Sequence, residues 1–238
     1  MCIRDRSLTD ALNSQVGRKF LTGITGLLLV FFVIFHLMGN LAIFGDPNAM
    51  NEYSKFLHDF GPLLWVARIG LLIALILHAW IGISIWWNKR KARPQKYKVY
   101  SSKGGPSKQS LSSRSMAFTG VVLLVFLVIH IKTFAMGNTE LIMVAGTEYH
   151  DLKSLVLATF QNPVYAFGYA IVMILLGTHL GHGIWSAFVS LTMRRKKTSA
   201  ILYTIGAILA IALAVGFLFI PLYIYFGGGC EAVLISCN

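Results

Sequence analysis

The chain of 238 residues has only three cysteines and contains neither a Cys-x-x-Cys pair nor a cysteine–histidine pattern with metal-ligand spacing. A cysteine-based metal motif is therefore excluded. Residues 1–6 look like a translated sequencing-library adaptor rather than native protein, so Cys2 is set aside with them. The other two, Cys230 and Cys237, lie seven residues apart near the C-terminus, where they either form a disulfide or remain two unrelated thiols.

The chain also lacks a segment outside its apolar stretches that is long enough to form a soluble domain. The chain is 56% hydrophobic with a mean hydropathy of +0.67, and most of it lies in five apolar stretches: residues 20–44, 63–87, 116–136, 165–193 and 200–226. Each stretch exceeds the roughly 20 residues that a helix needs to cross a bilayer. We expect an all-α integral membrane protein, with one five-helix transmembrane bundle over residues 7–238.

Acidic residues are scarce, and the basic ones are unevenly placed. Of the 21 lysines and arginines, 17 lie before the first apolar stretch, in residues 89–114 or in residues 194–197, while seven of the nine acids lie on the opposite side. Basic loops stay on the cytoplasmic side, which predicts an inside N-terminus and an outside C-terminus. This rule accounts for the net charge of +12 without a nucleic-acid partner. The basic loop 89–106 then contacts either a partner protein or anionic lipid headgroups.

Four histidines inside the apolar stretches fall at two depths. His36 and His130 lie 17 and 16 residues beyond the nearest basic cluster, whereas His78 and His182 lie 11 and 12 residues before theirs. At about 1.5 Å of rise per residue, the two layers differ in height by roughly 6 to 9 Å. Intramembrane ionisable residues are usually functional, so the spacing predicts an outer pair, His36 with His130, and an inner pair, His78 with His182.

Two imidazoles in each layer, with no acid beside them, suit haem b better than other metal groups. Zinc and copper sites prefer three or four protein ligands, whereas a porphyrin supplies four nitrogens itself. Two axial histidines leave the iron six-coordinate, which favours electron transfer over oxygen chemistry. The sequence therefore predicts two haem b groups, each held by one pair.

Three further polar residues lie close to the predicted haem layers. His179 precedes His182 by three residues and would sit roughly 4.5 Å too high to face His78, so it is either a hydrogen-bonding neighbour of the site or a packed core histidine. Arg68 and Lys132 lie near the outer ends of their helices. They either pair with haem propionates or extend their charges to the interface.

Seven short features follow one another in order along residues 14–225. They are GRK at 17–19, HLMGN at 36–40, HAWIG at 78–82, SRSM at 113–116, His130, HLGHGIWSAF at 179–188 and IPLYIY at 220–225. In this order the chain resembles the cytochrome b membrane anchor of bacterial succinate dehydrogenase (complex II), in its single-subunit, five-helix, two-haem form. In that family four histidines bind the haems, with helix one paired to three and two to four.

The resemblance implies a complex in a bacterial cytoplasmic membrane. A flavoprotein and an iron–sulfur subunit would dock at the cytosolic face and pass electrons to the inner haem, the outer haem and then a quinone, generally menaquinone. Candidate quinone-binding residues in the first outer loop are Glu52, Tyr53 and His58, with simple solvation as the alternative. Related fumarate reductase anchors sometimes carry a proton-transferring Glu two residues before the fourth ligand. Here that position is Leu180.

Three alternatives remain open. A fumarate reductase anchor shares the architecture, with electrons flowing the other way. The anchor of a hydrogenase or formate dehydrogenase would share the haems, and only the order of the motifs argues against it. A non-haem transporter predicts broken helices or an internal repeat, and neither is evident in the sequence. An optical spectrum of the reduced protein separates a transporter from a cytochrome.

Overall fold

The computed structural model describes residues 7–92, 111–191 and 199–228. Several predictions fall outside this part of the chain: the adaptor-like residues 1–6, the pairing of Cys230 with Cys237, most of the basic loop and the basic cluster 194–197. The described part is mostly helical, with one small hairpin.

Within the described residues, five helices are long and apolar enough to cross a membrane, as the sequence predicts. Their bounds are α2 Gln15–Asn40, α4 Pro62–Lys91, α5 Leu111–His130, α7 Pro163–Ser190 and α8 Ser199–Tyr223. Three of them continue in short helical turns of other types, η1 Leu41–Phe44 after α2, η2 Ile131–Ala135 after α5 and η3 Ile224–Gly228 after α8. With these turns included, the observed spans match the predicted ones to within a few residues. The chain is a multi-pass membrane protein by this architecture.

Local sequence explains where the long helices begin and end. The Ser14 side chain accepts a hydrogen bond from the Gly17 amide at the start of α2, as an N-cap residue does. Prolines occupy the first position of α4 and of α7, where the missing amide costs nothing. Pro221 lies near the end of α8 and removes one helical hydrogen bond, and the wider turn η3 follows it.

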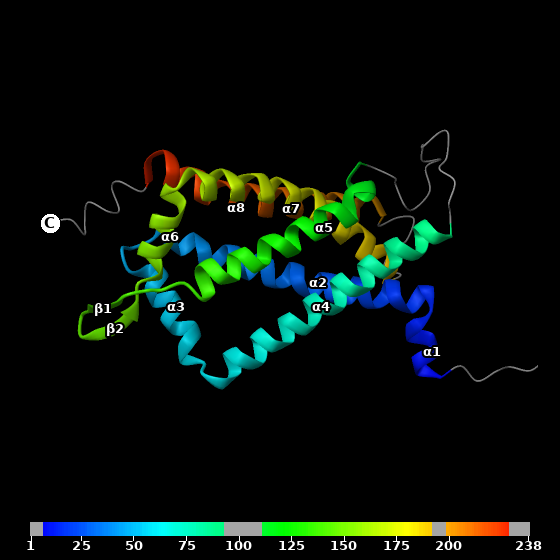
Figure 1. The fold of residues 1–238 in the computed structure, drawn as a ribbon, viewed down its shortest axis with the longest axis horizontal. Helices are drawn as coiled ribbons and strands as arrows, with labels where there is room; N and C mark the ends of the chain where they lie inside the picture. The colour runs from blue at the N-terminus through cyan, green and yellow to red at the C-terminus, as the bar shows by residue number, and fades with distance from the viewer. Residues whose placement is uncertain (1–6, 93–110, 192–198, 229–238) are drawn as a thin grey trace, which may run out of the picture.

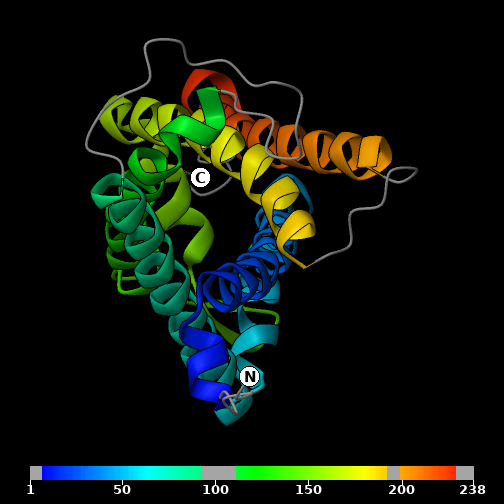
Figure 2. The same ribbon diagram turned by 90° about the vertical axis from the view of Figure 1, so that its right-hand side faces the viewer.

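The long helices form a bundle in which α8 lies at the edge (Figures 1 and 2). Helix α2 packs against both α4 and α7, α5 packs against both α7 and α4, and α8 packs mainly on α7. Four helices therefore surround a common interior, and these are the four that carry the predicted histidine ligands.

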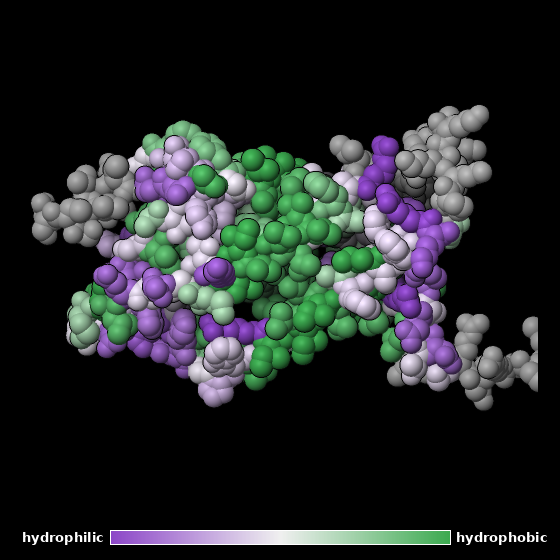
Figure 3. Space-filling model, viewed as in Figure 1, coloured by the Kyte–Doolittle hydropathy of each residue, from purple (hydrophilic) through white to green (hydrophobic). Residues whose placement is uncertain are grey.

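Hydrophobic side chains cover the middle of the face shown in Figure 3, with hydrophilic side chains toward both ends. Most large apolar residues of α4 and α5 are exposed in the isolated chain. A surface of this kind is stable when hydrocarbon covers it, so this apolar band marks the membrane-spanning part. The helix α1, Leu8–Asn13, lies at one end of the bundle and η3 at the other (Figure 1).

Shorter elements cap the end opposite α1, and the sequence predicted none of them. They are α3 Ala49–Asp59, α6 Leu152–Gln161 and an antiparallel hairpin, β1 Leu141–Val144 with β2 Thr147–His150. The hairpin turns at Ala145 and Gly146, both with positive φ, as a tight two-residue turn requires. The all-α expectation is therefore corrected by one small sheet outside the apolar band.

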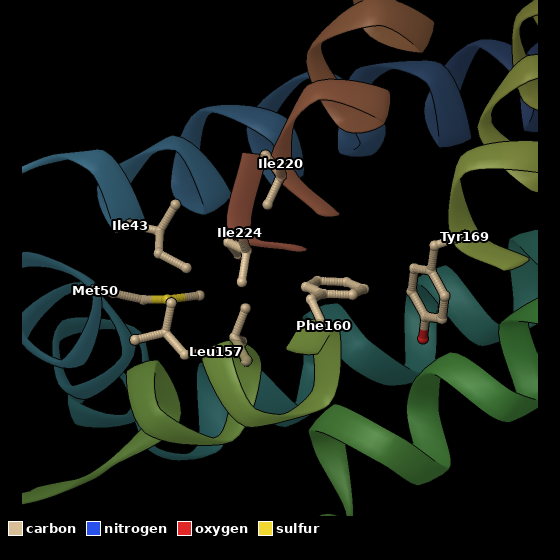
Figure 4. Close-up of a cluster of buried hydrophobic side chains, with 8 residues drawn as sticks. Ile43, Met50, Leu157, Phe160, Tyr169, Ile220 and Ile224 are labelled. Carbon is tan, nitrogen blue, oxygen red and sulfur yellow. The ribbon is translucent and has the colours of Figure 1, made fainter. Parts of the chain in front are cut away.

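The cap is held on the bundle by a buried apolar cluster (Figure 4). Its core members come from η1, α3, α6, α7, the end of α8 and η3: Ile43, Met50, Val156, Leu157, Phe160, Tyr169, Ile220 and Ile224. This outer cluster joins both outer loops to the helix ends, and Phe126 and Phe134 pack against it from α5 and η2.

Candidate functional site

The predicted outer pair meets inside the bundle. His36 on α2 and His130 on α5 have ring centroids 5.6 Å apart with planes at 86°. Both are half-buried. Five aromatic rings surround the pair: those of Phe32 and Phe217 lie beside His36, and those of Phe126, Phe134 and Tyr169 lie beside His130. The outer pair thus lies in an aromatic cage that shares Tyr169 with the outer cluster.

The surroundings of His130 suggest a missing partner. Its Nδ1 is buried without a hydrogen-bond partner in the described structure, and buried polar atoms are usually satisfied. The π-helical turn η2 begins at the next residue, and such turns are frequent at functional sites.

The inner pair differs from the one that the sequence predicts. The ring of His78 on α4 lies beside that of His179 on α7, with centroids 6.5 Å apart and planes at 69°. Within the described residues, His182 has no such ring contact with His78 and lies one turn further along α7. The prediction that His182 is the inner ligand stays untested, but the geometry favours His179.

The two reference residues from which the depths of His78 and His182 were counted are not equivalent. Lys89 lies within α4, which continues to Lys91, whereas Arg194 lies beyond the last residue of α7, Ser190. Counted from the helix ends, His78 lies 13 residues from the end of α4, and His179 and His182 lie 11 and 8 residues from the end of α7. His179 is the better match for the depth of His78.

Threonine hydroxyls contact both inner imidazoles. Thr25 Oγ1 of α2 lies 3.4 Å from Nδ1 of His78, and Thr119 Oγ1 of α5 lies 3.0 Å from Nδ1 of His179. The backbone carbonyl of Thr22 lies 3.3 Å from the same nitrogen of His78. Each inner imidazole is therefore held at Nδ1 by a neighbouring helix.

Thr25 and Thr119 are each followed by a glycine that lets the imidazole approach the helix closely. A Cβ on Gly26 would lie 3.0 Å from Cε1 of His78, and one on Gly120 would lie 3.3 Å from Cε1 of His179. Both distances are shorter than ordinary carbon contacts of about 3.5–4.0 Å. The two glycines therefore form matching recesses for the inner pair.

The ring separations of both histidine pairs are close to that of two axial imidazoles on a six-coordinate haem iron. With about 2 Å from metal to each imidazole nitrogen and roughly 1 Å from that nitrogen to the ring centre, two axial imidazoles have centres roughly 6 Å apart. The observed 5.6 and 6.5 Å lie on either side of that separation. Among the described residues, no group of three or more His, Cys, Asp or Glu side chains is arranged to hold a metal ion. Two-histidine sites need a group that brings its own further ligands.

The propionate candidates are exposed on the bundle. The guanidinium of Arg68, on α4, stacks over the Trp65 ring at 5.1 Å, which is a cation–π contact. Lys132 lies in η2, two residues after His130. Their pairing with propionates stays a prediction.

The quinone candidates in α3 separate into different environments. The Tyr53 ring packs on the α2 backbone at Gly39, where a Cβ would lie 2.3 Å from its Cε1, and Gly39 is three residues from His36. His58 instead faces His150 across 6.3 Å, in a pocket of about 180 Å³ between α3 and the hairpin. Glu52 is exposed. Of the three candidates, Tyr53 is therefore the one that packs on α2 close to His36 of the outer pair.

Neither candidate inner ligand has a carboxylate two residues before it. Leu180, two before His182, is buried against Ile184, Ala210 and Leu213. Gly177, two before His179, packs closely on α8, where an added Cβ would lie 2.8 Å from Cβ of Ala214. Both positions serve the packing of α7 on its neighbours.

The hydroxyls and glycines beside the inner pair were not predicted, although the sequence carries a signal for them. A Thr-Gly pair precedes a histidine by the same interval in α2 (TGLLLVFFVIFH, 25–36) and in α5 (TGVVLLVFLVIH, 119–130). This repeat is short, and only five of its twelve positions are identical, so it was missed.

No family model, curated protein or solved structure matches this chain. The function proposed below rests on the helix bundle, the two histidine pairs and the resemblance of the motifs.

Proposed function

We propose that this chain is the dihaem cytochrome b membrane anchor of a bacterial succinate dehydrogenase, which conducts electrons from an iron–sulfur subunit to a membrane quinone. The observation that carries the proposal is the presence of two imidazole pairs within one bundle, His36 with His130 and His78 with His179, at separations of 5.6 and 6.5 Å. The resemblance of the motifs selects succinate dehydrogenase among dihaem cytochromes.

In this proposal the four histidines are the axial ligands of two haem b groups. A bound bis-histidine haem supplies reversible one-electron transfer without an open coordination position. The chain's own residues hold the imidazoles in place: aromatic rings around the outer pair, and hydroxyls and glycine recesses around the inner pair. The apolar helices keep water from both sites, which favours electron transfer over reaction with solvent.

The proposed orientation follows the charge distribution. The end of the bundle near α1, toward which the basic segments lead, faces the cytosol, where the flavoprotein and iron–sulfur subunits dock. The capped end faces outward and binds the quinone, generally menaquinone in the family that the chain resembles. Tyr53, on the backbone one turn from His36, is the preferred quinone contact.

The test is purification of the chain from a bacterial membrane with its associated proteins. We expect close to two haems b per chain, a flavoprotein and an iron–sulfur protein in the same complex, and haem reduction by succinate. A haem content near zero would exclude a cytochrome. Two haems without succinate-dependent reduction would indicate another dihaem anchor.

A further inference from the structure

The two inner histidines occupy equivalent places in two similar helix pairs. Helices α2 and α4 form one pair and α5 and α7 the other. In each pair, the first helix carries a Thr-Gly sequence and, eleven residues after the threonine, an outer histidine. The second helix carries an inner histidine followed four residues later by a glycine, which gives His78 with Gly82 and His179 with Gly183. The equivalent residues of the two pairs meet across the interior in both layers. The hydroxyl contact recurs as well, so it is a repeated feature of the bundle.

Each threonine hydroxyl lies within hydrogen-bonding distance of a backbone carbonyl of its own helix. Thr25 Oγ1 donates to the Leu21 carbonyl at 2.8 Å, and Thr119 Oγ1 donates to the Ser115 carbonyl at 3.1 Å. A hydroxyl has one proton, so an oxygen that gives its proton to the carbonyl can only accept from the imidazole.

The direction of the contact at Nδ1 follows from this. For Nδ1 of His179, the contact is the Thr119 oxygen. For Nδ1 of His78, the second contact is the Thr22 carbonyl, which has no proton to give. With the hydroxyl protons given to the carbonyls of their own helices, Nδ1 of both histidines carries the proton and Nε2 keeps the lone pair that binds a metal.

We propose that Thr25 and Thr119 are positioning residues that fix His78 and His179 in the Nδ1–H tautomer and so prepare Nε2 of each for axial ligation of the inner haem. The haem part of this inference rests on the proposed function. The tautomers are a property of the protein alone.

The contact also tunes the site. An imidazole that donates from Nδ1 becomes a more basic ligand and stabilises the oxidised iron. Loss of the hydroxyl should therefore raise the midpoint potential of the inner haem. The effect should be larger for Thr119 than for Thr25, because His78 keeps the Thr22 carbonyl as a second acceptor.

The first experiment is a redox titration of the purified complex carrying Thr25→Val or Thr119→Val. We expect Thr119→Val to raise the inner-haem potential by about 59 mV, a tenfold change in the ratio of oxidised to reduced haem, with the outer haem unchanged. Thr119→Ser should restore the original potential. Thr178→Val is the matched control, because its exposed hydroxyl bonds to the Leu175 carbonyl of its own helix. An unchanged inner potential in Thr119→Val would overturn the tuning role.

The second experiment needs no haem. Nitrogen NMR of the full wild-type chain, labelled at histidine and purified without haem, reports the tautomer of each imidazole. We expect Nδ1–H for His78 and His179, and a loss of that uniform state for His179 in Thr119→Val. The Nε2–H tautomer at either histidine in the wild-type chain would refute the proposal. Since this readout is independent of haem, it distinguishes failure of the tautomer from failure of the proposed function.

Discussion

The inner and outer histidine pairs are held by different kinds of contact. The outer imidazoles lie among five aromatic rings, and Nδ1 of His130 is buried without a partner in the described structure. The inner imidazoles each meet a threonine hydroxyl and a glycine recess on a neighbouring helix. The same two helices, α2 and α5, take part in both layers.

This difference indicates that the two sites respond to different perturbations. A hydrogen bond fixes an imidazole by direction, so the inner site is sensitive to single atoms on α2 and α5. Ring packing fixes an imidazole by volume, and the outer cage shares Tyr169 with the outer cluster. We therefore expect the outer site to respond to changes in α3 and α6 of the cap more strongly than the inner site does.

Removal of single ligands should have the largest effect. We expect His179→Ala to lose the inner haem and His36→Ala to lose the outer one, because each leaves a single axial imidazole in its layer. His182→Ala should retain both haems. Haem content and low-temperature spectra of the purified complexes measure this. Retention of both haems in His179→Ala, with loss in His182→Ala, would restore the assignment made from the sequence.

Filling the glycine recesses should perturb only the inner site. Gly26→Ala places a methyl group 3.0 Å from the His78 ring and should push it from its preferred rotamer at a cost of about 0.5–1.5 kcal/mol, lowering haem affinity roughly 2- to 12-fold. Gly120→Ala, at 3.3 Å, should have a smaller effect. Titration of the haem-free protein with haem gives the affinities.

A matched control is available on α4. Gly70 has no atom within 4 Å of an added Cβ, so Gly70→Ala tests the general effect of alanine in a membrane helix. Equal loss of inner haem in Gly70→Ala and Gly26→Ala would contradict the recess.

The membrane spans could be predicted because hydrocarbon imposes a length and a composition on every crossing helix. The pairing of His36 with His130 could be predicted too, since both histidines were counted from basic residues that lie near the starts of their helices. The count from the sequence favoured His182 over His179 because it used Lys89, which lies within α4, and Arg194, which follows the last residue of α7. The choice between the two histidines stays a prediction. Sequence distance is a poor measure of depth when a reference residue lies beyond the helix.

The cap could not be predicted from periodicity. The helices α3 and α6 are short, and the hairpin depends on the backbone conformation at Ala145 and Gly146. Their order comes from contacts that are distant in sequence, such as Met50 packing with Leu157 in the outer cluster. The hydroxyl contacts of the inner pair were hidden for the same reason, because each joins residues on different helices.

Loosening the cap should disturb the outer site alone. Asn51 is 3% exposed, donates to Asp151 at 3.1 Å and accepts from the Lys153 amide at 3.0 Å. Asn51→Ala leaves those groups without their partner, at a cost of about 1–3 kcal/mol. We expect faster amide exchange in α6 and an altered outer-haem spectrum, with the inner haem unchanged. Asn48→Ala is the control, since its side chain makes no capping bond. An equal change in both haems would show that the cap is not specific to the outer site.

Acidification should loosen the cap in a milder and reversible way. Partial burial raises the pKa of Asp151, but hydrogen bonds from Ser154 and Asn51 and the nearby charge of Lys153 outweigh it, so the pKa lies below its ordinary value of 3.8. A carboxyl with a lowered folded-state pKa contributes stability above its unfolded pKa and loses it as the pH falls through the folded one. Amide exchange in α6, corrected for its intrinsic pH dependence, should therefore quicken below about pH 4. Asp151→Asn should raise exchange at neutral pH and remove the acid-dependent part, whereas Asp46→Asn, in the same outer region, should retain it. If the acid-dependent rise in exchange persists in Asp151→Asn, another titrating group causes it. Asn51→Ala alone would then test the coupling between the cap and the outer pair.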